Sequence, residues 1–181
     1  QREALRQAIA FKSYEFNCHG VETNQRYQSG AVVSDGTPMP EFARDRELYY
    51  QATSWPGAKL PHAWVFDHAN HQVSTLDLCG KGGFTVLTVI GGEAWLEAAR
   101  DVGAELGLEI AAVTIGPGRD YVDNFGDWAR ASEIEDGGCI LVRPDIYVGW
   151  RHAKAAGNAK ELLRDALTSI LGRKVNAARN A

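Results

Sequence analysis

The stretch that decides the fold is residues 84–115, FTVLTVIGGEAWLEAARDVGAELGLEIAAVTI, in which one amphipathic segment separates two apolar runs. Phe84–Ile90 is rich in β-branched residues, as expected of a strand buried on both faces. Glu93–Leu106 repeats its apolar residues at helical spacing, and Leu108–Ile115 is a second apolar run of strand length. Together they predict a βαβ unit, whose two strands are parallel and joined by a right-handed crossover.

The residues after this unit predict a second helix, a hairpin and a final helix. Tyr121–Ile134 is typical of a weak helix, whereas Ala159–Leu171 places its leucine and isoleucine residues on one helical face. Cys139–Arg143 and Tyr147–Trp150 predict two short strands joined by a turn that contains proline. The order β-α-β-α-β-β-α predicts an α/β fold, more specifically a thioredoxin-like sandwich with helices on both faces of the sheet.

The residues before this unit are less regular. Gln1–Lys12 predicts a short amphipathic helix, and Val73–Leu78 predicts a further strand. Residues 1–30 do not look like a self-contained unit, so we expect this helix and arm to dock on something else. The expected organisation is an N-terminal arm over 1–30, a folded domain over 31–172 and a frayed tail over 173–181.

Composition and charge exclude several classes of protein. Apolar residues make up 45% and charged residues 23% of the 181 residues, which excludes disordered, collagen-like and coiled-coil chains. No apolar run approaches the roughly 18 residues that would span a bilayer. A formal net charge of −4 gives no general attraction to nucleic acid or anionic membranes. The chain begins with Gln1 and its only methionine is Met39, so we expect a processed chain or a piece of a longer one.

The three cysteines, Cys18, Cys79 and Cys139, are widely spaced and form no CxxC motif. A disulfide framework is therefore not expected, and a reducing cytoplasm fits the pattern better. A working thioredoxin carries CxxC at the turn after its first strand, where the helix N-terminus lowers the thiol pKa. The corresponding turn here, residues 89–95, contains no cysteine, so thiol–disulfide chemistry is not expected.

Neither glycine-rich stretch makes a nucleotide-binding motif. Residues 80–82 (GKG) precede a predicted strand and residues 116–118 (GPG) follow one, but both lack the third glycine of the dinucleotide fingerprint. Residues 67–71 (DHANH) contain possible metal ligands, yet they form a polar stretch with no further histidine or cysteine paired to it. We therefore predict no catalytic, cofactor-binding or metal-binding residue in this chain.

Short blocks along nearly the whole chain resemble one family of enzymes. The blocks are Phe16–Glu22 (FNCHGVE), Gln25–Tyr27 with Ser29, Pro56–His62 (PGAKLPH), Ser74–Leu78 (STLDL), Phe84–Leu87 (FTVL), Leu141–Asp145 (LVRPD) and Val148–Arg151 (VGWR). They occur in the order typical of the FAD-dependent aromatic hydroxylases, and they resemble the phenol and chlorophenol monooxygenase group in particular.

The resemblance implies a larger enzyme that consists of two parts with different functions. In that family the N-terminal two-thirds binds FAD and the phenol, and the C-terminal third is a thioredoxin-like domain without redox cysteines. NADPH reduces the FAD, which then uses O₂ to hydroxylate the phenol ring ortho to its hydroxyl group. The resemblance therefore implies that residues 1–30 end the FAD and substrate domain. It also implies that the rest is the non-catalytic C-terminal domain, with FAD held outside this chain.

Four residues are candidates for an interface with that domain or with a second copy in a homodimer, namely His62, Arg143, Asp145 and Arg151. Arg143 and Asp145 flank a proline turn and Arg151 ends the next strand, so a charge cluster that pins the hairpin is the structural alternative. A structural role is the alternative for His62 as well. The family often has glycine where this chain has Ile146, which leaves the geometry of that turn open.

Two rival interpretations remain at this point. A free-standing binding module with a thioredoxin fold would recognise a ligand or a protein without catalysis, and its reading frame would begin with Met just before Gln1. A redox enzyme would instead depend on Cys79. The sequence does not identify the phenol, because the resemblance places the substrate pocket in the other domain.

Overall fold

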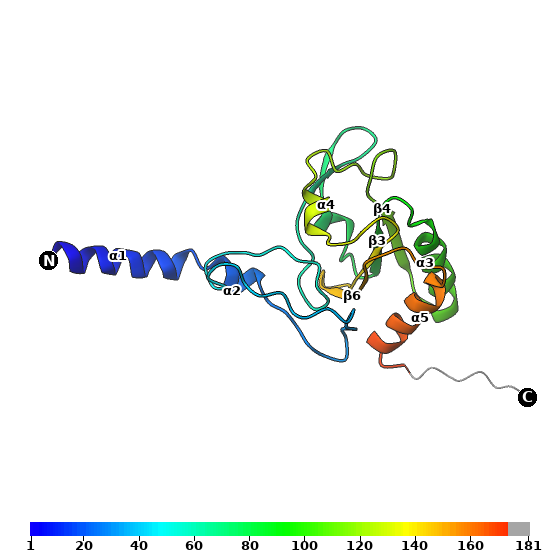
Figure 1. Ribbon diagram of the computed structural model, residues 1–181, viewed down its shortest axis with the longest axis horizontal. Helices are drawn as coiled ribbons and strands as arrows, with labels where there is room; N and C mark the ends of the chain where they lie inside the picture. The colour runs from blue at the N-terminus through cyan, green and yellow to red at the C-terminus, as the bar shows by residue number, and fades with distance from the viewer. Residues whose placement is uncertain (174–181) are drawn as a thin grey trace, which may run out of the picture.

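The structure is a computed structural model that describes residues 1–173, and it begins with a helix that protrudes from the rest of the chain (Figure 1). In chain order the elements are α1 (Arg2–Phe16), α2 (His19–Thr23), β1 (Trp64–Phe66), β2 (Gln72–Ser74), the 3₁₀ helix η1 (Thr75–Leu78), β3 (Phe84–Thr88), α3 (Glu93–Leu106), β4 (Ile110–Thr114), α4 (Asp127–Ala131), β5 (Cys139–Val142), β6 (Val148–His152) and α5 (Ala159–Ile170). The tail predicted to fray lies outside the described residues from residue 174 onward. None of the helices described is long and apolar enough to cross a membrane.

Four strands form one mixed sheet in the order β4-β3-β5-β6. Strands β3 and β4 are parallel, whereas β5 pairs antiparallel with both β3 and β6. The predicted βαβ unit, the closing hairpin and the α/β class are thus confirmed, and the element order from β3 to α5 is the predicted one. The more specific likeness to the thioredoxin fold stays a prediction.

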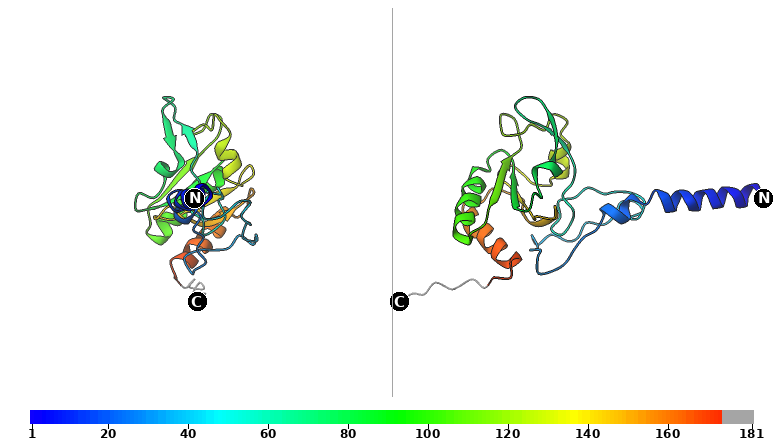
Figure 2. Two further views of the ribbon diagram at one scale, coloured as in Figure 1. Left: turned by 90° about the vertical axis from the view of Figure 1, so that its left-hand side faces the viewer. Right: turned by 180° about the vertical axis from the view of Figure 1, so that it is seen from behind.

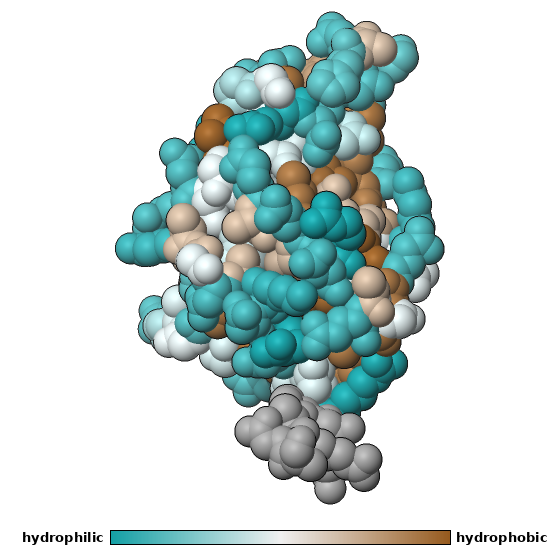
Figure 3. Space-filling view, turned by 90° about the vertical axis from the view of Figure 1, so that its right-hand side faces the viewer, coloured by the Kyte–Doolittle hydropathy of each residue, from teal (hydrophilic) through white to brown (hydrophobic). Residues whose placement is uncertain are grey.

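The sheet separates two apolar cores. Helices α3 and α5 lie on one face of the sheet (Figures 1 and 2). There Trp95, Leu163 and Leu167 belong to the same buried core as Val86 of β3. The opposite face is covered by α4, η1 and the β1–β2 hairpin, and the buried residues there include Leu60, Val65, Leu87, Trp128 and Ile140. Figure 3 looks onto the side that carries α3 and α5, and hydrophilic residues cover much of it. This is expected of helices whose apolar sides are turned to the sheet.

Several predicted elements differ in extent from the observed ones, and α1, for example, ends at Phe16 rather than at Lys12. The strand predicted over Val73–Leu78 ends at Ser74, whose hydroxyl accepts the Leu76 N–H at 3.1 Å and so begins η1. The helix predicted over Tyr121–Ile134 is reduced to the five residues of α4. Its first residues are extended instead, because Tyr121 and the residue after it form bridges to the chain after β4 and to β1.

The segment between α2 and β1 contains no named helix or strand, yet it is attached to the sheet. The Val33 N–H donates to the Gly149 carbonyl at 2.8 Å, and the Tyr27 N–H donates to the Gly57 carbonyl at 2.9 Å. The second of these bonds crosses the boundary that we place at residue 30. The division into an arm over 1–30 and a domain over 31–172 stays a proposal.

Ile146, in the turn between β5 and β6, has a left-handed backbone with φ of 68°. A β-branched residue is rare in this conformation, which costs about 1–2 kcal/mol. The side chain is half-buried at the edge of the second core. The glycine that the family often has at this position would adopt the conformation without strain.

We expect Ile146→Gly to change the free energy of unfolding by less than about 1 kcal/mol, because relief of backbone strain offsets the lost packing. Leu163→Ala, in the fully buried first core, should cost about 2–5 kcal/mol and serves as the contrast. Urea unfolding followed by circular dichroism measures both. A loss in the Ile146 variant as large as that in the Leu163 variant would show that the turn is not strained.

Candidate functional site

Arg151, on β6, is a buried cation with two carboxylate partners. Its side chain is 7% exposed, and its guanidinium donates to the Asp35 carboxylate (Nε–Oδ2 2.8 Å) and to the Glu133 carboxylate (Nη1–Oε2 2.6 Å). The hydroxyls of Ser54 and Thr37 accept further bonds at 3.0 and 3.3 Å. The cluster therefore joins the irregular segment between α2 and β1 (residues 24–63, the N-terminal segment), the chain after α4 and the last strand of the sheet.

Asp35 shows how this cluster balances its charges. Burial alone raises the pKa of the Asp35 carboxyl, but hydrogen bonds from Thr37 and the charge of Arg151 outweigh it and leave the pKa below its usual value. Asp35 is therefore a carboxylate, and its negative charge offsets the buried guanidinium. The arrangement holds segments of the chain together and leaves neither group free to act on a substrate.

Arg143 and Asp145 form a separate pair at the β5–β6 turn. The Arg143 Nη2 contacts the Asp145 Oδ2 at 2.6 Å, and its Nη1 donates to the Ala31 carbonyl at 3.1 Å. Arg143 thus ties the hairpin to the N-terminal segment. The structure brings Arg143 and Asp145 together, but it places Arg151 in the other cluster.

His62 lies at the surface, beside β1. Its Nδ1 is 2.8 Å from the Ser74 Oγ, and its ring meets the Trp64 ring edge-on, with centroids 4.7 Å apart. With Asp127 and Arg130 these rings line an open cleft of about 430 Å³. The interface role of His62, Arg143, Asp145 and Arg151 is not tested by these contacts and stays a prediction.

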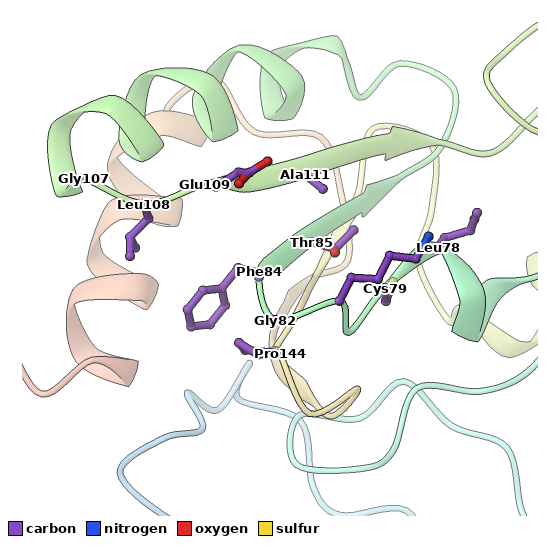
Figure 4. Close-up of a pocket in the computed structure, with 12 residues that line it drawn as sticks. Leu78, Cys79, Gly82, Phe84, Thr85, Gly107, Leu108, Glu109, Ala111 and Pro144 are labelled. Atoms are coloured by element: carbon purple, nitrogen blue, oxygen red, sulfur yellow. The ribbon is translucent and has the colours of Figure 1, made fainter.

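An open pocket of about 500 Å³ lies at the beginning of β3 and alongside β4 (Figure 4). Phe84 and Thr85 point to opposite sides of β3, and Cys79 lies on the Thr85 side of the strand. The wall is otherwise mostly glycine backbone and small or apolar side chains, and its charged residues, Lys81 and Glu109, are exposed. Cys79 is the cysteine that lines this pocket and the residue on which the redox interpretation depends.

Burial suppresses the reactivity of that thiol. It raises the pKa of Cys79 to about 12 and that of Cys139 well above its ordinary value. Cys18, by contrast, is only partly buried, and all three cysteines are free thiols.

We expect an aromatic disulfide reagent at mildly alkaline pH to label Cys18 rapidly and the two buried thiols only after denaturation. The absorbance of the released thiolate counts the thiols that react. Cys18→Ser is the matched variant and should remove the rapid phase. Rapid labelling that persists in this variant would revive the redox interpretation.

The described residues do not fit a resident FAD or metal ion. A dinucleotide cradle needs a glycine turn that leads directly into a helix. Residues 80–82 instead lead into β3, and residues 116–118 are followed by an extended segment before α4. Gly91 and Gly92 do lead from β3 into α3, but they are adjacent and are followed by EAWL, so they lack the G-x-G-x-x-G spacing. No three metal-binding side chains cluster within residues 1–173, and the candidate His71 is paired with Asp67, Nδ1–Oδ2 3.0 Å.

Comparison with known proteins identifies relatives along almost the whole chain. Residues 53–174 match the family model described as aromatic-ring hydroxylase, C-terminal. The 2,4-dichlorophenol 6-monooxygenase of Cupriavidus pinatubonensis is 51% identical over 175 residues, which are 96% of this chain and 29% of that enzyme. The phenol 2-monooxygenase of Pseudomonas sp. (strain EST1001) is 42% identical over 168 residues, which are 93% of this chain and 28% of that enzyme.

A solved structure agrees with these matches. The flavin-dependent monooxygenase PieE, in complex with FAD and substrate, superposes with a TM-score of 0.87 at 48% identity, over 96% of this chain and 29% of PieE. The chain thus spans less than a third of the relatives that it matches. On the match over residues 53–174, this chain belongs to the C-terminal domain family of the aromatic-ring hydroxylases.

Proposed function

We propose that this chain is the non-catalytic C-terminal domain of a flavin-dependent phenol or chlorophenol monooxygenase. In the whole enzyme FAD, NADPH and the phenol would be bound by an N-terminal domain, where FAD with O₂ supplies the hydroxylation chemistry. The similarity to two phenol monooxygenases and to a structure that holds FAD supports this proposal. So does the poor fit of the described residues to a flavin of their own.

The observation that carries the proposal is the exposed apolar stripe of α1. Leu5, Ile9 and Phe16 lie on one side of this helix and are 61%, 61% and 78% exposed. An isolated helix of 15 residues is marginally stable in water, so a helix of this kind needs a surface to pack on. We assign that surface to the N-terminal domain, since α1 projects away from the sheet (Figure 2).

We further propose that the whole enzyme is a homodimer in the cytoplasm. Three free thiols suit a reducing compartment. The exposed His62 and Asp145 are available for contacts with a second copy or with the N-terminal domain. Arg151, with its guanidinium bonded internally, would contribute by holding the N-terminal segment in place.

A chimera tests this proposal. This chain replaces the 29% of the Cupriavidus 2,4-dichlorophenol 6-monooxygenase that it matches. We expect the purified chimera to retain FAD and to consume NADPH in the presence of 2,4-dichlorophenol. A folded chimera that binds no FAD would contradict the proposed function.

The role of α1 is tested in the same chimera by Leu5→Asp and Ile9→Asp, which place a charge in the apolar stripe. Each should lower the amount of bound FAD and the thermal stability, because the stripe is buried when α1 docks. Gln7→Lys, which places a charge on the opposite side of the helix, is the matched control, because residue 7 already contacts the Glu3 carboxylate. Equal behaviour of all three variants would show that the stripe does not dock.

A further inference from the structure

A second pocket, of about 230 Å³, lies where the chain leaves the parallel strands β3 and β4. Val89 and Ile90 line it after β3, residues 115–117 line it after β4, and α4 with its flanking residues closes it. Open α/β sheets bind ligands outside the carboxyl ends of their parallel strands, which is the place of this pocket. It lies at the opposite end of β3 from the pocket in Figure 4.

Two buried polar atoms of its lining residues, Trp128 Nε1 and Ser132 Oγ, have no hydrogen-bond partner among the described residues. Trp128 is 1% exposed and Ser132 is fully buried. An indole N–H can only donate, and a buried one usually finds an acceptor. Trp55 and Trp95, which are also buried, do so, donating to backbone carbonyls at 3.2 and 2.7 Å.

These two atoms belong to residues four apart, which share one side of a helical turn. An acceptor atom that reached either of them would satisfy a donor, and an unsatisfied buried donor costs about 1–3 kcal/mol. The side chains that make up most of the remaining wall are apolar: Val89, Ile90, Ile115, Pro117, Ala129 and Ile134. The pocket therefore favours an apolar body that carries one acceptor.

The charges at the pocket disfavour an anion. Its lining carboxylates belong to Asp123 and Asp136. Asp123 accepts the backbone N–H groups of Asp127 and Ala129 at the beginning of α4, at 3.1 and 2.9 Å. No lysine or arginine lines the pocket to offset these charges.

We propose that this pocket binds a small neutral molecule with a body of single-ring size and one oxygen that accepts hydrogen bonds from Trp128 and Ser132. A dry cavity of about 150 Å³ accommodates benzene, so the volume suffices for a substituted ring. Both donor atoms are covered in the unbound chain, so binding requires a small movement of the pocket wall. The inference concerns this domain alone and does not rest on the proposed function.

The test is a titration of the ¹⁵N-labelled 181-residue chain with phenol, followed through the five tryptophan indole N–H resonances. Trp128→Phe assigns the resonance of interest. We expect that resonance to move to a saturable limit with phenol, whereas toluene, which has the ring but no oxygen, should bind about fivefold more weakly or not at all. No saturable movement, or equal affinity for toluene, would overturn the proposal.

Two variants locate the site. Ser132→Ala should weaken phenol binding about fivefold by removing one donor, whereas Ser169→Ala, on the exposed side of α5, should leave it unchanged. Ala129→Leu fills the pocket from an exposed position of α4 and should abolish saturation without disturbing the core. Undiminished binding by Ala129→Leu, or a crystal structure of the phenol-soaked chain with only a water on the two atoms, would refute the site.

Discussion

Arg151→Met should lower the free energy of unfolding by about 3–5 kcal/mol, one of the two largest effects that we expect from a single substitution in this chain. The methionine keeps much of the side-chain volume but removes the cation, and Asp35, with a side chain only 6% exposed, is left buried without its partner. Ser54 and Thr37 lose a donor as well. The irregular N-terminal segment should therefore separate from β6 before the sheet itself unfolds.

Urea unfolding followed by tryptophan fluorescence measures this effect. The matched control is Arg100→Met, because Arg100 is 74% exposed and contacts Asp101 at 3.4 Å, a surface pair whose loss should change the free energy by about 0–1 kcal/mol. The double variant Arg151→Met/Asp35→Asn should recover part of the loss, since it removes the stranded charge. Equal stability of the two arginine variants would show that the buried cluster contributes nothing.

The same cluster predicts how stability depends on pH. The pKa of Asp35 is lower in the folded chain than its ordinary value of 3.8, so the unfolded chain binds the proton more tightly. The contribution of Asp35 is therefore fully present above that ordinary value and is lost as the pH falls through the lower folded pKa. The difference in melting temperature between the wild type and Asp35→Asn should shrink as the pH falls below about 4. A constant difference from neutral to acidic pH would contradict this linkage.

Gly57→Ala should lower the free energy of unfolding by a comparable amount, although it adds a single methyl group. Gly57 has φ of 99°, a conformation that costs about 1–3 kcal/mol for a residue with a side chain. A Cβ there would lie 2.0 Å from the Tyr27 carbonyl oxygen, so the backbone on one side must move. Movement would break the bonds by which Gly57 joins Tyr27 and Val148, at 2.9 and 2.8 Å, and so release the N-terminal segment.

Gly30→Ala is the control for this variant, because a Cβ at residue 30 meets nothing within 4 Å and the backbone is not left-handed there. Limited proteolysis should cut Gly57→Ala between residues 20 and 60 much faster than it cuts Gly30→Ala or the wild type. The melting temperature of Gly57→Ala should likewise be lower than that of Gly30→Ala or the wild type. Equal rates of cleavage would show that the contact with Tyr27 is not needed to hold the segment.

The sequence alone determined the central architecture of this protein. Phe84–Thr88 and Ile110–Thr114 are strands and Glu93–Leu106 is a helix, where the periodicity predicted them. These predictions were possible because the buried face of a strand or helix is made of apolar residues at a regular spacing, which is visible within a few positions of the sequence. The prediction of a helix over residues 121–134 failed because its first residues are held extended by bridges to β1 and to the chain after β4, which are distant contacts that a local pattern does not reveal.

Only the tertiary structure decided which side chains meet. Asp35 and Arg151 are 116 residues apart in the chain, and no local pattern pairs them or adds Glu133 to the cluster. The pocket beside Trp128 and Ser132 is likewise formed by three segments that are separate in the chain: the residues after β3, the residues after β4, and α4. They meet beyond the carboxyl ends of the parallel strands. Periodicity is local and reports which face of an element is buried, whereas contacts between distant residues depend on the path of the whole chain. Loops, whose backbones follow no period, carry most of these contacts.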